Sequence, residues 1–376
     1  MKLKKTLERL QKLHPKEIDL SLNRVQNLCK KLGNPQKFIK CISVVGTNGK
    51  YSTIQAMKAI LNEAKIHCNI YTSPHLQKVN ERFVFNNKQI SDHHLSKLLL
   101  EVEEVNDGNP ITYFEILTAA FFYYAKNYKY NINLIESGLF HRFDATNIIK
   151  ENLASIITAI GLDHLDWLPK NEKTIEKIVF EKTSSLLNSK IIVSNQTSNK
   201  ILNIIKKNIS NNNSKKTIYN EQFSCSENEN GFIYYEDEKG GLKLPKPNIL
   251  GEFQIDNIAS AIATLRSLDF KIKEDHIKKG ITKIKSIARL QEIKSGKLKN
   301  LCKNNKIFVD GSHNPLGAKV LNKYLDNFNC NKHIILGMMA NKDHQEYMSY
   351  FKNISSLTTV DIPNQTNAIK GIELKN

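Results

Sequence analysis

The sequence predicts an α/β protein in which a large domain, with a mostly parallel sheet and a phosphate-binding loop, precedes a smaller, Rossmann-like α/β domain. Short runs rich in Ile and Val alternate with helical patterns over roughly the first half of the chain, as in parallel sheets that helices cover on both faces. A glycine-rich loop, Gly46–Lys50 (the glycine loop), joins one such run to the next helical pattern. A second alternation of strands and helices begins near residue 288. We therefore expect two domains, residues 1–287 and 288–376.

Before the glycine loop, residues 4–33 follow a helical pattern that contains Pro15, and Cys41–Val45 forms a short buried strand. After the loop, Tyr51–Lys65 places its apolar residues on one helical face. Further buried strands, separated by helical patterns, are predicted at Asn69–Tyr71, Ile132–Ile135, Ala154–Ile160 and Ile191–Ser194.

Residues 208–250 interrupt this alternation. A polar run leads into short alternating segments around Gly231–Tyr235, with Gly240–Gly241 as a turn. We interpret this region as a small β excursion within the first domain. Helical patterns resume at 254–268 and 274–284. The second domain is expected to contain strand 307–310, helix 315–328, strand 333–337, helix 343–352 and strand 357–360, and it is short.

The composition favours a globular cytoplasmic protein. Of the 376 residues 40% are hydrophobic, enough for cores in two domains. No segment reaches the roughly 20 apolar residues that a bilayer crossing needs, and the charged start MKLKKTLERLQKL lacks the apolar run of a signal peptide. The six cysteines include no Cys-x-x-Cys pair, which favours reduced thiols over zinc or disulfides. We expect no membrane partner.

The net charge of +18 raises the question of nucleic-acid binding. The excess is spread along the chain, is mostly lysine, and accompanies heavy use of Asn and Ile, as in KKNISNNNSKK from Lys206. No basic motif is interleaved with aromatic residues. We therefore expect weak attraction of acidic ligands and no nucleic-acid partner.

The glycine loop has the residue types of a phosphate site. A glycine-rich turn between strand and helix directs backbone N–H groups and a helix N-terminus toward phosphate, and Lys50 adds a charge for the outer phosphates. The alternative is an ordinary glycine turn with an incidental lysine, but the strand–turn–helix context favours phosphate. From Gly46 the loop is two residues shorter than the common G-x-x-x-x-G-K-[ST] pattern, and Tyr51 stands where that pattern has Ser or Thr.

Two polar residues end predicted strands further along. Glu136 and His164 each follow a buried run, at the edge where doubly wound sheets gather ligand-binding groups. Beside a phosphate loop, such a pair could hold Mg²⁺ together with phosphate oxygens. Either residue alone is more often a satisfied polar group at a strand end.

Motifs in a characteristic order make the chain similar to the folylpolyglutamate synthase/dihydrofolate synthase family, a branch of the ATP-dependent Mur ligases. They are DLSLNR at 19–24, GTNGKYS at 46–52, TSPHL at 72–76, NERF at 80–83, TYFE at 112–115, RFDATN at 142–147, IGLDH at 160–164, FEK at 180–182, GEFQIDN at 251–257, ARLQ at 288–291, DGSHNP at 310–315 and NKD at 341–343. The resemblance implies a Mur ligase-like central domain.

The chain departs from the family pattern at several positions. In the family, glycine follows the loop lysine and a hydroxyl residue comes next, so Tyr51 replaces a glycine and Ser52 fills the hydroxyl position. Phe140-His141 stands where Gly-Gly is usual, and Ala288 replaces a glycine before Arg289. We expect Tyr51 to be tolerated, with its ring directed away from phosphate, and to have no catalytic role.

The resemblance implies an enzyme in which ATP phosphorylates a substrate carboxylate and the amine of L-glutamate then attacks the acyl phosphate. The acceptor would be dihydropteroate, a reduced folate or both, and the protein a monomer. Positions that match ATP-binding positions of the family are Asn48, Gly49, Lys50, Tyr51, Ser52, Asn257, Arg289, Asp310 and His313. Asn314 would support the same edge.

The implied cofactor is Mg²⁺, held by Ser73, Glu136 and His164, and the resemblance also admits a monovalent cation. Lys182 matches a lysine that carries CO₂ as a carbamate and binds a second Mg²⁺; from spacing alone it would be an ordinary surface charge. Lys50, Glu136, His164 and Lys182 are the expected catalytic residues. Family positions for the pterin or folate substrate are Asp19, Leu20, Thr112, Phe114, Glu115, Phe143, Asp144 and Ala145.

Three other functions compete with this one. Another Mur-type peptide ligase is opposed by DLSLNR and TYFE, which resemble the folate branch. A catalytically impaired nucleotide-binding homologue is favoured by Tyr51, Phe140-His141 and the short second domain. A basic nucleic-acid protein would show steeply salt-dependent binding.

Overall fold

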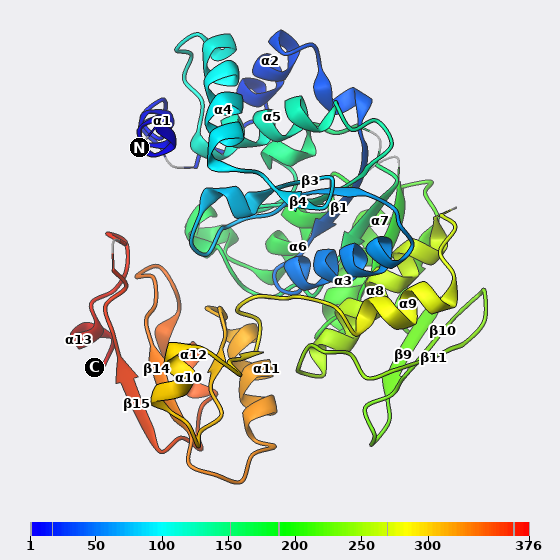
Figure 1. Cartoon of the computed structure of the whole chain (residues 1–376), viewed down its shortest axis with the longest axis vertical. Coiled ribbons are helices and arrows are strands. Elements are labelled where there is room, and N and C mark those ends of the chain that lie inside the picture. Colours follow the sequence, from blue (N-terminus) through cyan, green and yellow to red (C-terminus); the bar gives the residue numbers. More distant parts are fainter. Residues whose placement is uncertain are drawn as a thin grey trace.

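The computed structural model describes residues 2–16, 18–150, 152–186, 189–268, 270–363 and 365–375. Its centre is an eight-stranded sheet of order β4-β3-β2-β5-β1-β6-β7-β8 (Figure 1). The β3–β4 hairpin is antiparallel to its neighbour β2, and the other pairs are parallel. The strands are β1 (Lys40–Val45), β2 (Cys68–Tyr71), β3 (Phe83–Phe85), β4 (Lys88–Gln89), β5 (Ile132–Glu136), β6 (Ala154–Ile157), β7 (Lys190–Val193) and β8 (Lys216–Ile218).

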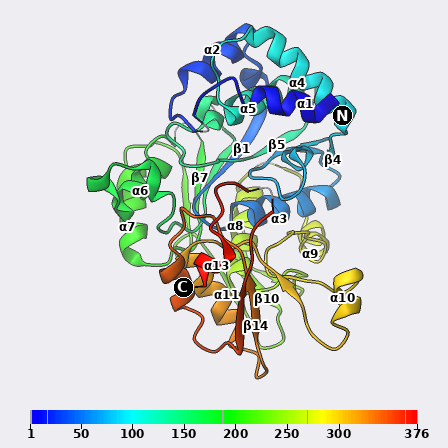
Figure 2. The ribbon, with the colours of Figure 1, turned by 90° about the vertical axis from the view of Figure 1, so that its left-hand side faces the viewer.

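Helices cover both faces of this sheet (Figures 1 and 2). One face packs against α3 (Lys50–Glu63), α8 (Phe253–Ser267) and α9 (Glu274–Ile281). The other face is shared by two groups of helices. They are α1 (Lys2–Leu10), α2 (Asn23–Lys31), α4 (Asp92–Asn106) and α5 (Tyr113–Ala125) on one half, and α6 (Ile175–Thr183) and α7 (Asn199–Ile209) on the other. The predicted α/β class with a mostly parallel sheet is confirmed.

Local signals set where several helices begin. The side-chain oxygens of Ser91, Thr112, Thr174 and Ser198 accept hydrogen bonds from the first turns of α4, α5, α6 and α7, which satisfies N–H groups that have no partner within a helix. Single 3₁₀ turns lie at η1 (Pro35–Phe38), η2 (Val79–Arg82), η3 (Ala145–Ile148), η4 (Leu165–Trp167) and η5 (Lys170–Glu172).

Two predicted elements have different bounds. The helical pattern of residues 4–33 is two helices, α1 and α2, because the chain between them contains Pro15 and is irregular. The strand expected at Ala154–Ile160 ends at Ile157. Beyond it the carbonyl of Ala159 accepts hydrogen bonds from the N–H groups of Thr47 and Asn48, at 3.0 and 3.1 Å, so this segment supports the glycine loop and leaves the sheet.

The β excursion is divided between two sheets. β8 pairs in parallel with β7 and forms the edge of the main sheet, which the polar run around it did not indicate. The remainder is a separate antiparallel sheet of β9 (Phe223–Glu227), β10 (Ile233–Asp237) and β11 (Leu242–Leu244), which shares its core with α8.

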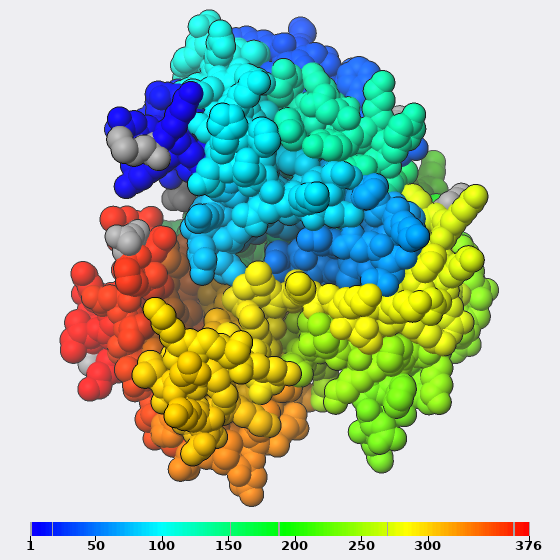
Figure 3. Space-filling model, viewed as in Figure 1, coloured from blue at the N-terminus to red at the C-terminus, as the bar shows by residue number. Residues whose placement is uncertain are grey.

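Residues 288–363 and 365–375 form a C-terminal lobe, which lies below the main sheet in Figure 1 and is coloured yellow to red in Figure 3. Its core is a separate cluster around Ala318, Leu336, Met338, Tyr347 and Phe351. Its elements are β12 (Gln291–Glu292), α10 (Lys297–Leu301), β13 (Phe308–Val309), α11 (Pro315–Leu325), β14 (His333–Leu336), α12 (His344–Ser349), β15 (Ser356–Thr359) and α13 (Gly371–Leu374). None of the helices in the described part of the chain has the length and apolarity to span a membrane.

Candidate active site

The glycine loop connects the end of β1 to the start of α3, where its glycines allow close approaches. Gly46 has φ of 147°, and a Cβ there would lie 2.0 Å from Thr158 Oγ1. Gly49 has φ of 92°, and a Cβ there would lie 2.3 Å from the amide oxygen of Asn257 on α8. Both positions therefore require glycine, and Asn257 lies against the N-terminus of α3.

Two buried amines share this loop. Lys50 Nζ donates to the carbonyls of Gly46 and Thr47, at 3.2 and 3.0 Å, and burial lowers its pKa. Lys182 Nζ, from α6, donates to the carbonyls of Gly46 and Leu139, each at 3.0 Å. Burial, helped by the charge of Lys50, lowers the pKa of Lys182 to about 7. A substantial fraction of Lys182 is consequently a neutral amine near neutral pH.

Glu136 lies at the end of β5, beside the glycine loop in the sheet. Its Oε2 accepts a hydrogen bond from the backbone N–H of Ser73 at 3.1 Å. Burial raises the pKa of this carboxyl, and the nearby charge of Lys50 opposes that shift. A bound cation would favour the ionised form further, so Glu136 suits a site that receives positive charge.

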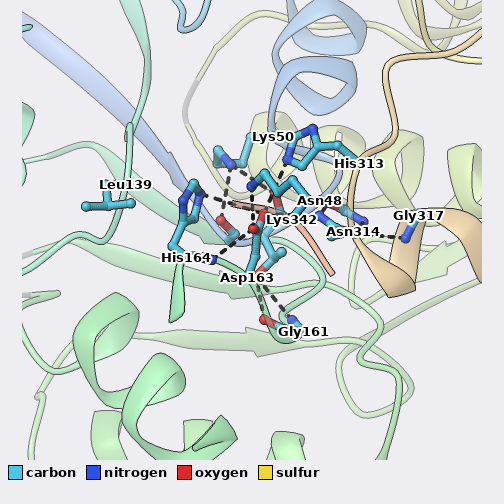
Figure 4. Close-up of polar contacts among 12 residues, drawn as sticks. Asn48, Lys50, Leu139, Gly161, Asp163, His164, His313, Asn314, Gly317 and Lys342 are labelled. Carbon is cyan, nitrogen blue, oxygen red and sulfur yellow. Dashed lines mark hydrogen bonds and ion pairs between the residues drawn. The ribbon is translucent and has the colours of Figure 1, made fainter. Parts of the chain in front are cut away.

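His164 follows β6 and lies close to the same loop (Figure 4). Its backbone has φ of 58°, a left-handed conformation that turns the chain into η4. Burial lowers the pKa of its imidazole to about 3, so the ring is neutral and has a lone pair for a metal. The ring of Phe140 packs edge-on against it, with centroids 6.4 Å apart.

Side chains of the C-terminal lobe contact Asp163, which immediately precedes His164 (Figure 4). Asp163 Oδ1 accepts from Lys342 Nζ at 2.8 Å, and Oδ2 accepts from Asn314 Nδ2 at 3.1 Å. His313 Nε2 lies 3.4 Å from Oδ2. The side-chain amides of Asn48 and Asn314 also pair at 3.0 Å. The glycine loop, His164 and the C-terminal lobe thus meet at one place.

Arg289 and Asp310 lie where the chain enters the C-terminal lobe. Asp310 accepts hydrogen bonds from the N–H groups of Leu290 and Ser312, at 2.6 and 2.8 Å. The Arg289 guanidinium donates to the carbonyl of Ala288 at 2.9 Å and lies 5.8 Å from the centroid of the Tyr51 ring. Tyr51 therefore sits between the start of α3 and an arginine of the junction.

Ser52 and Ser73 show no metal-like arrangement by themselves. The hydroxyl of Ser52 pairs with that of Ser286 at 3.0 Å, which ties α3 to the segment before the lobe. Among the described residues, no group of three or more His, Cys, Asp or Glu side chains could hold a metal ion. A metal here would need phosphate oxygens or water as further ligands, as Mg²⁺ commonly has.

The expected substrate residues form a second cluster at the α5 end of the same sheet edge. Arg24 binds both Asp19 and Glu115, at 2.7 and 2.9 Å. Glu115 also forms a capping box with Thr112, and its buried Oε1 has no hydrogen-bond partner among the described residues.

This cluster reaches the Glu136 strand end. Asp144 Oδ2 accepts from the N–H of Gly138 at 2.8 Å, and a Cβ at Gly138 would lie 3.1 Å from Phe114. Phe114 and Phe143 are half-buried, and Ala145 is buried. Leu20, also partly buried, packs against the core beneath α6 and α7.

Comparison with known proteins shows which family the chain resembles. No protein-family profile matches the chain. The chain is 29% identical over 355 residues to the dihydrofolate synthase/folylpolyglutamate synthase of Bacillus subtilis, covering 89% of this chain and 79% of the relative. It is 27% identical over 355 residues to the Escherichia coli protein of that name, covering 93% and 79%. Escherichia coli FolC in complex with DHPP and ADP superposes with a TM-score of 0.87 at 26% identity, over 99% of this chain and 86% of that one. The chain is therefore similar, over most of its length, to the dihydrofolate synthase/folylpolyglutamate synthase family.

The Phe140-His141 departure from the family pattern lies directly on Lys182. The Phe140 ring is buried, with Lys182 Nζ 5.6 Å from its centroid. His141 Nδ1 bonds the hydroxyl of Ser137 at 2.9 Å, and burial lowers its pKa to about 3. The two residues therefore wall the amine in apolar and neutral surroundings.

The Ala288 departure has a different consequence. Ala288 adopts φ of 50°, and Leu290 does the same. A glycine would adopt that conformation freely, whereas alanine makes it costlier and the junction stiffer.

The motifs contained two residues whose role spacing did not reveal. Asp163 precedes the predicted metal histidine, and Lys342 lies in the NKD motif of the C-terminal lobe. Each is an unremarkable charged residue in sequence. Their mutual contact, across 179 positions, shows that both are part of the site.

Proposed function

We propose that this protein is an ATP-dependent carboxylate–amine ligase that adds L-glutamate to dihydropteroate, to reduced folates or to both, through an acyl phosphate. The observation that carries the proposal is the meeting of the glycine loop, Glu136 and neutral His164 at the carboxyl ends of β1, β5 and β6. Such switch points are where open α/β sheets bind ligands. Relatives named for these two activities, and the FolC complex with DHPP and ADP, support it.

In the proposed reaction a substrate carboxylate oxygen attacks the γ-phosphorus of ATP, and the bond to the ADP oxygen breaks. The glutamate amine then attacks the acyl carbon, inorganic phosphate leaves, and the amine loses its proton. The protein needs no nucleophile for these steps; it must position anions and neutralise growing charge. Residues proposed to hold the nucleotide are Asn48, Gly49, Lys50, Tyr51, Ser52, Asn257, Arg289, Asp310 and His313.

Lys50 now bonds two loop carbonyls, so we infer that phosphate binding exchanges those contacts for phosphate oxygens. The carbonyl bonds keep the buried amine satisfied until the nucleotide arrives. This would keep the loop in its phosphate-binding shape in the absence of ligand.

The residues present fit a Mg²⁺ ion. Glu136 offers a carboxylate, His164 a neutral nitrogen, and Ser73 lies against Glu136 through its backbone. When bound, Mg²⁺ would offset negative charge on the phosphates. A solved relative from Yersinia pestis at 25% identity, with a TM-score of 0.86 over 99% of this chain and 86% of that one, was captured with AMPPNP and manganese.

We further propose that Lys182 carries CO₂ as a carbamate. Carbamylation requires the neutral amine, which a pKa of about 7 supplies. When CO₂ bonds to the neutral amine, a proton leaves the nitrogen, which gives up its contacts with the carbonyls of Gly46 and Leu139, and an anion forms beside the metal residues. The site would also bind the monovalent cation that the resemblance admits.

The pterin end of the acceptor is proposed to bind along Asp19, Leu20, Thr112, Phe114, Glu115, Phe143, Asp144 and Ala145. The open Oε1 of Glu115 supports this assignment, because a buried carboxylate oxygen without a partner favours a ligand with N–H donors. Phe114 lies next to Gly138, two residues after Glu136, so an acceptor bound here would extend toward the metal residues.

We also propose that residues 1–287 and 288–376 are the two domains, that the protein is a cytoplasmic monomer, and that it binds no nucleic acid or membrane. The separate core of the C-terminal lobe supports the division. Nucleotide bound between Lys50 and Arg289 would bridge the two domains and exclude water from the acyl phosphate.

The test measures ADP release with ATP, Mg²⁺ and L-glutamate, with dihydropteroate and tetrahydrofolate offered separately. We expect glutamate-dependent ADP release with at least one acceptor. ATP binding without any such release would overturn the proposal and favour a nucleotide-binding homologue.

A further inference from the structure

Asp163 connects three parts of the site that the sequence places far apart. Its Oδ1 accepts from Lys342 Nζ and from the backbone N–H of His164, at 2.8 and 2.9 Å. Its Oδ2 accepts from Asn314 Nδ2 at 3.1 Å and faces His313 Nε2 at 3.4 Å. Lys342, Asn314 and His313 all belong to the C-terminal lobe. Only 5% of the Asp163 side chain is exposed.

The segment that carries Asp163 is also bound to the glycine loop. Thr47 Oγ1 donates to the carbonyl of Gly161 at 3.0 Å and accepts from its N–H at 3.1 Å. A Cβ on Gly161 would lie 3.1 Å from Leu316 of the C-terminal lobe. A shift of the lobe at this contact would therefore move Asp163 relative to His164 and the loop.

We propose that Asp163 is a positioning residue, which sets the C-terminal lobe in register with the glycine loop by pairing with Lys342. The inference rests on the proposed function, since register matters most where nucleotide must contact both domains. A hydrogen-bonded ion pair between lobes suits a contact that must also open. Each charge loses its hydration when the lobe docks and regains it when the lobe opens. A buried pair therefore contributes little net stability. The hydrogen-bond donors to Asp163 nevertheless define one position of the lobe relative to the glycine loop.

The geometry also separates this role from simple folding stability. Among the described residues, Asp163 is the one partner of the Lys342 side chain in hydrogen bonds and ion pairs. Its loss should therefore disturb docking and leave both cores intact. Nucleotide held by the glycine loop itself should still bind, while transfer of the phosphoryl group, which needs the closed arrangement, should slow.

The experiment compares Asp163→Asn, Lys342→Met and the double variant with matched controls on exposed residues, Asp166→Asn and Lys319→Met. Two readouts are used: the radius of gyration from small-angle X-ray scattering without ligand, and steady-state kcat with ADP affinity. We expect each single variant to increase the radius of gyration and to lower kcat by about tenfold or more, with ADP affinity within about threefold of wild type. The double variant should lose no more than either single variant, because both remove one interaction.

Unchanged scattering and kcat in Lys342→Met would overturn the proposal, as would independent, multiplying losses in the double variant. If Asp163→Asn fails to fold, Lys342→Met decides alone. If the wild-type protein shows no glutamate-dependent ADP release, the proposed function fails, and the scattering comparison still decides whether Asp163 and Lys342 hold the lobe in place.

Discussion

Replacing Lys182 with methionine should change how the stability of the protein depends on pH. The amine is fully buried, with a pKa of about 7 in the folded protein against 10.5 as its ordinary value. Between these pH values the unfolded chain binds a proton that the folded protein does not. The burial penalty is therefore complete below pH 7, shrinks as pH rises and is gone above pH 10.5. Lys182→Met removes this penalty at every pH and nearly preserves side-chain length.

The size of the effect follows from that difference in pKa. Removing the penalty is worth about 4 to 5 kcal/mol near pH 6.5 and about 1 kcal/mol near pH 9.5. The hydrogen bonds to Gly46 and Leu139 are lost at both pH values, so their cost cancels in the comparison. The stability of Lys182→Met relative to wild type should thus fall by about 3 kcal/mol between these pH values, or about 5 °C in Tm for a domain of this size.

The assay is chemical and thermal unfolding of both proteins at pH 6.5 and 9.5, followed by circular dichroism. Lys173→Met, an exposed lysine close to the same helix, is the control and should parallel wild type. A Lys182→Met variant whose stability relative to wild type is the same at both pH values would refute the reasoning. Such a result would mean that Lys182 is charged in the folded protein, and it would also weaken the case for a carbamate there.

Further outcomes concern turnover and nucleotide binding. Glu136→Gln and His164→Ala should each remove most turnover without unfolding the protein, and higher Mg²⁺ or Mn²⁺ should partly offset the loss; wild-type turnover at low Mg²⁺ would exclude them as metal ligands. Lys50→Ala should weaken ATP binding by more than about tenfold in calorimetry, because the charge aimed at phosphate is lost. Tyr51→Gly should change ATP affinity by less than about fivefold, since the contact that the ring makes at the junction is a cation–π contact to Arg289; loss of activity in that variant would give Tyr51 a direct role.

Local sequence determined most of the central sheet and the place of its site. The central strands are short, mostly apolar runs that are buried on both faces, namely β1, β2, β5, β6 and β7. Such runs can be recognised in the sequence without knowing which strands they pair with. The glycine loop was equally local, because strand, turn, lysine and helix follow one another. Glu136 and His164 could be assigned to one edge because the carboxyl ends of parallel strands meet there.

Tertiary structure decided the contacts that complete the site, because their partners are distant in sequence and chemically ordinary. β8 joined the main sheet through backbone pairing with β7, although two of its three residues are polar. The Tyr51 ring contacts Arg289, and the Phe140 ring contacts Lys182, because the fold brings these loops together at the sheet edge. Spacing likewise could not reveal the low pKa of Lys182, since burial causes it. The pairing of Asp163 with Lys342 joins charges 179 positions apart, and only the docking of the two lobes brings them together.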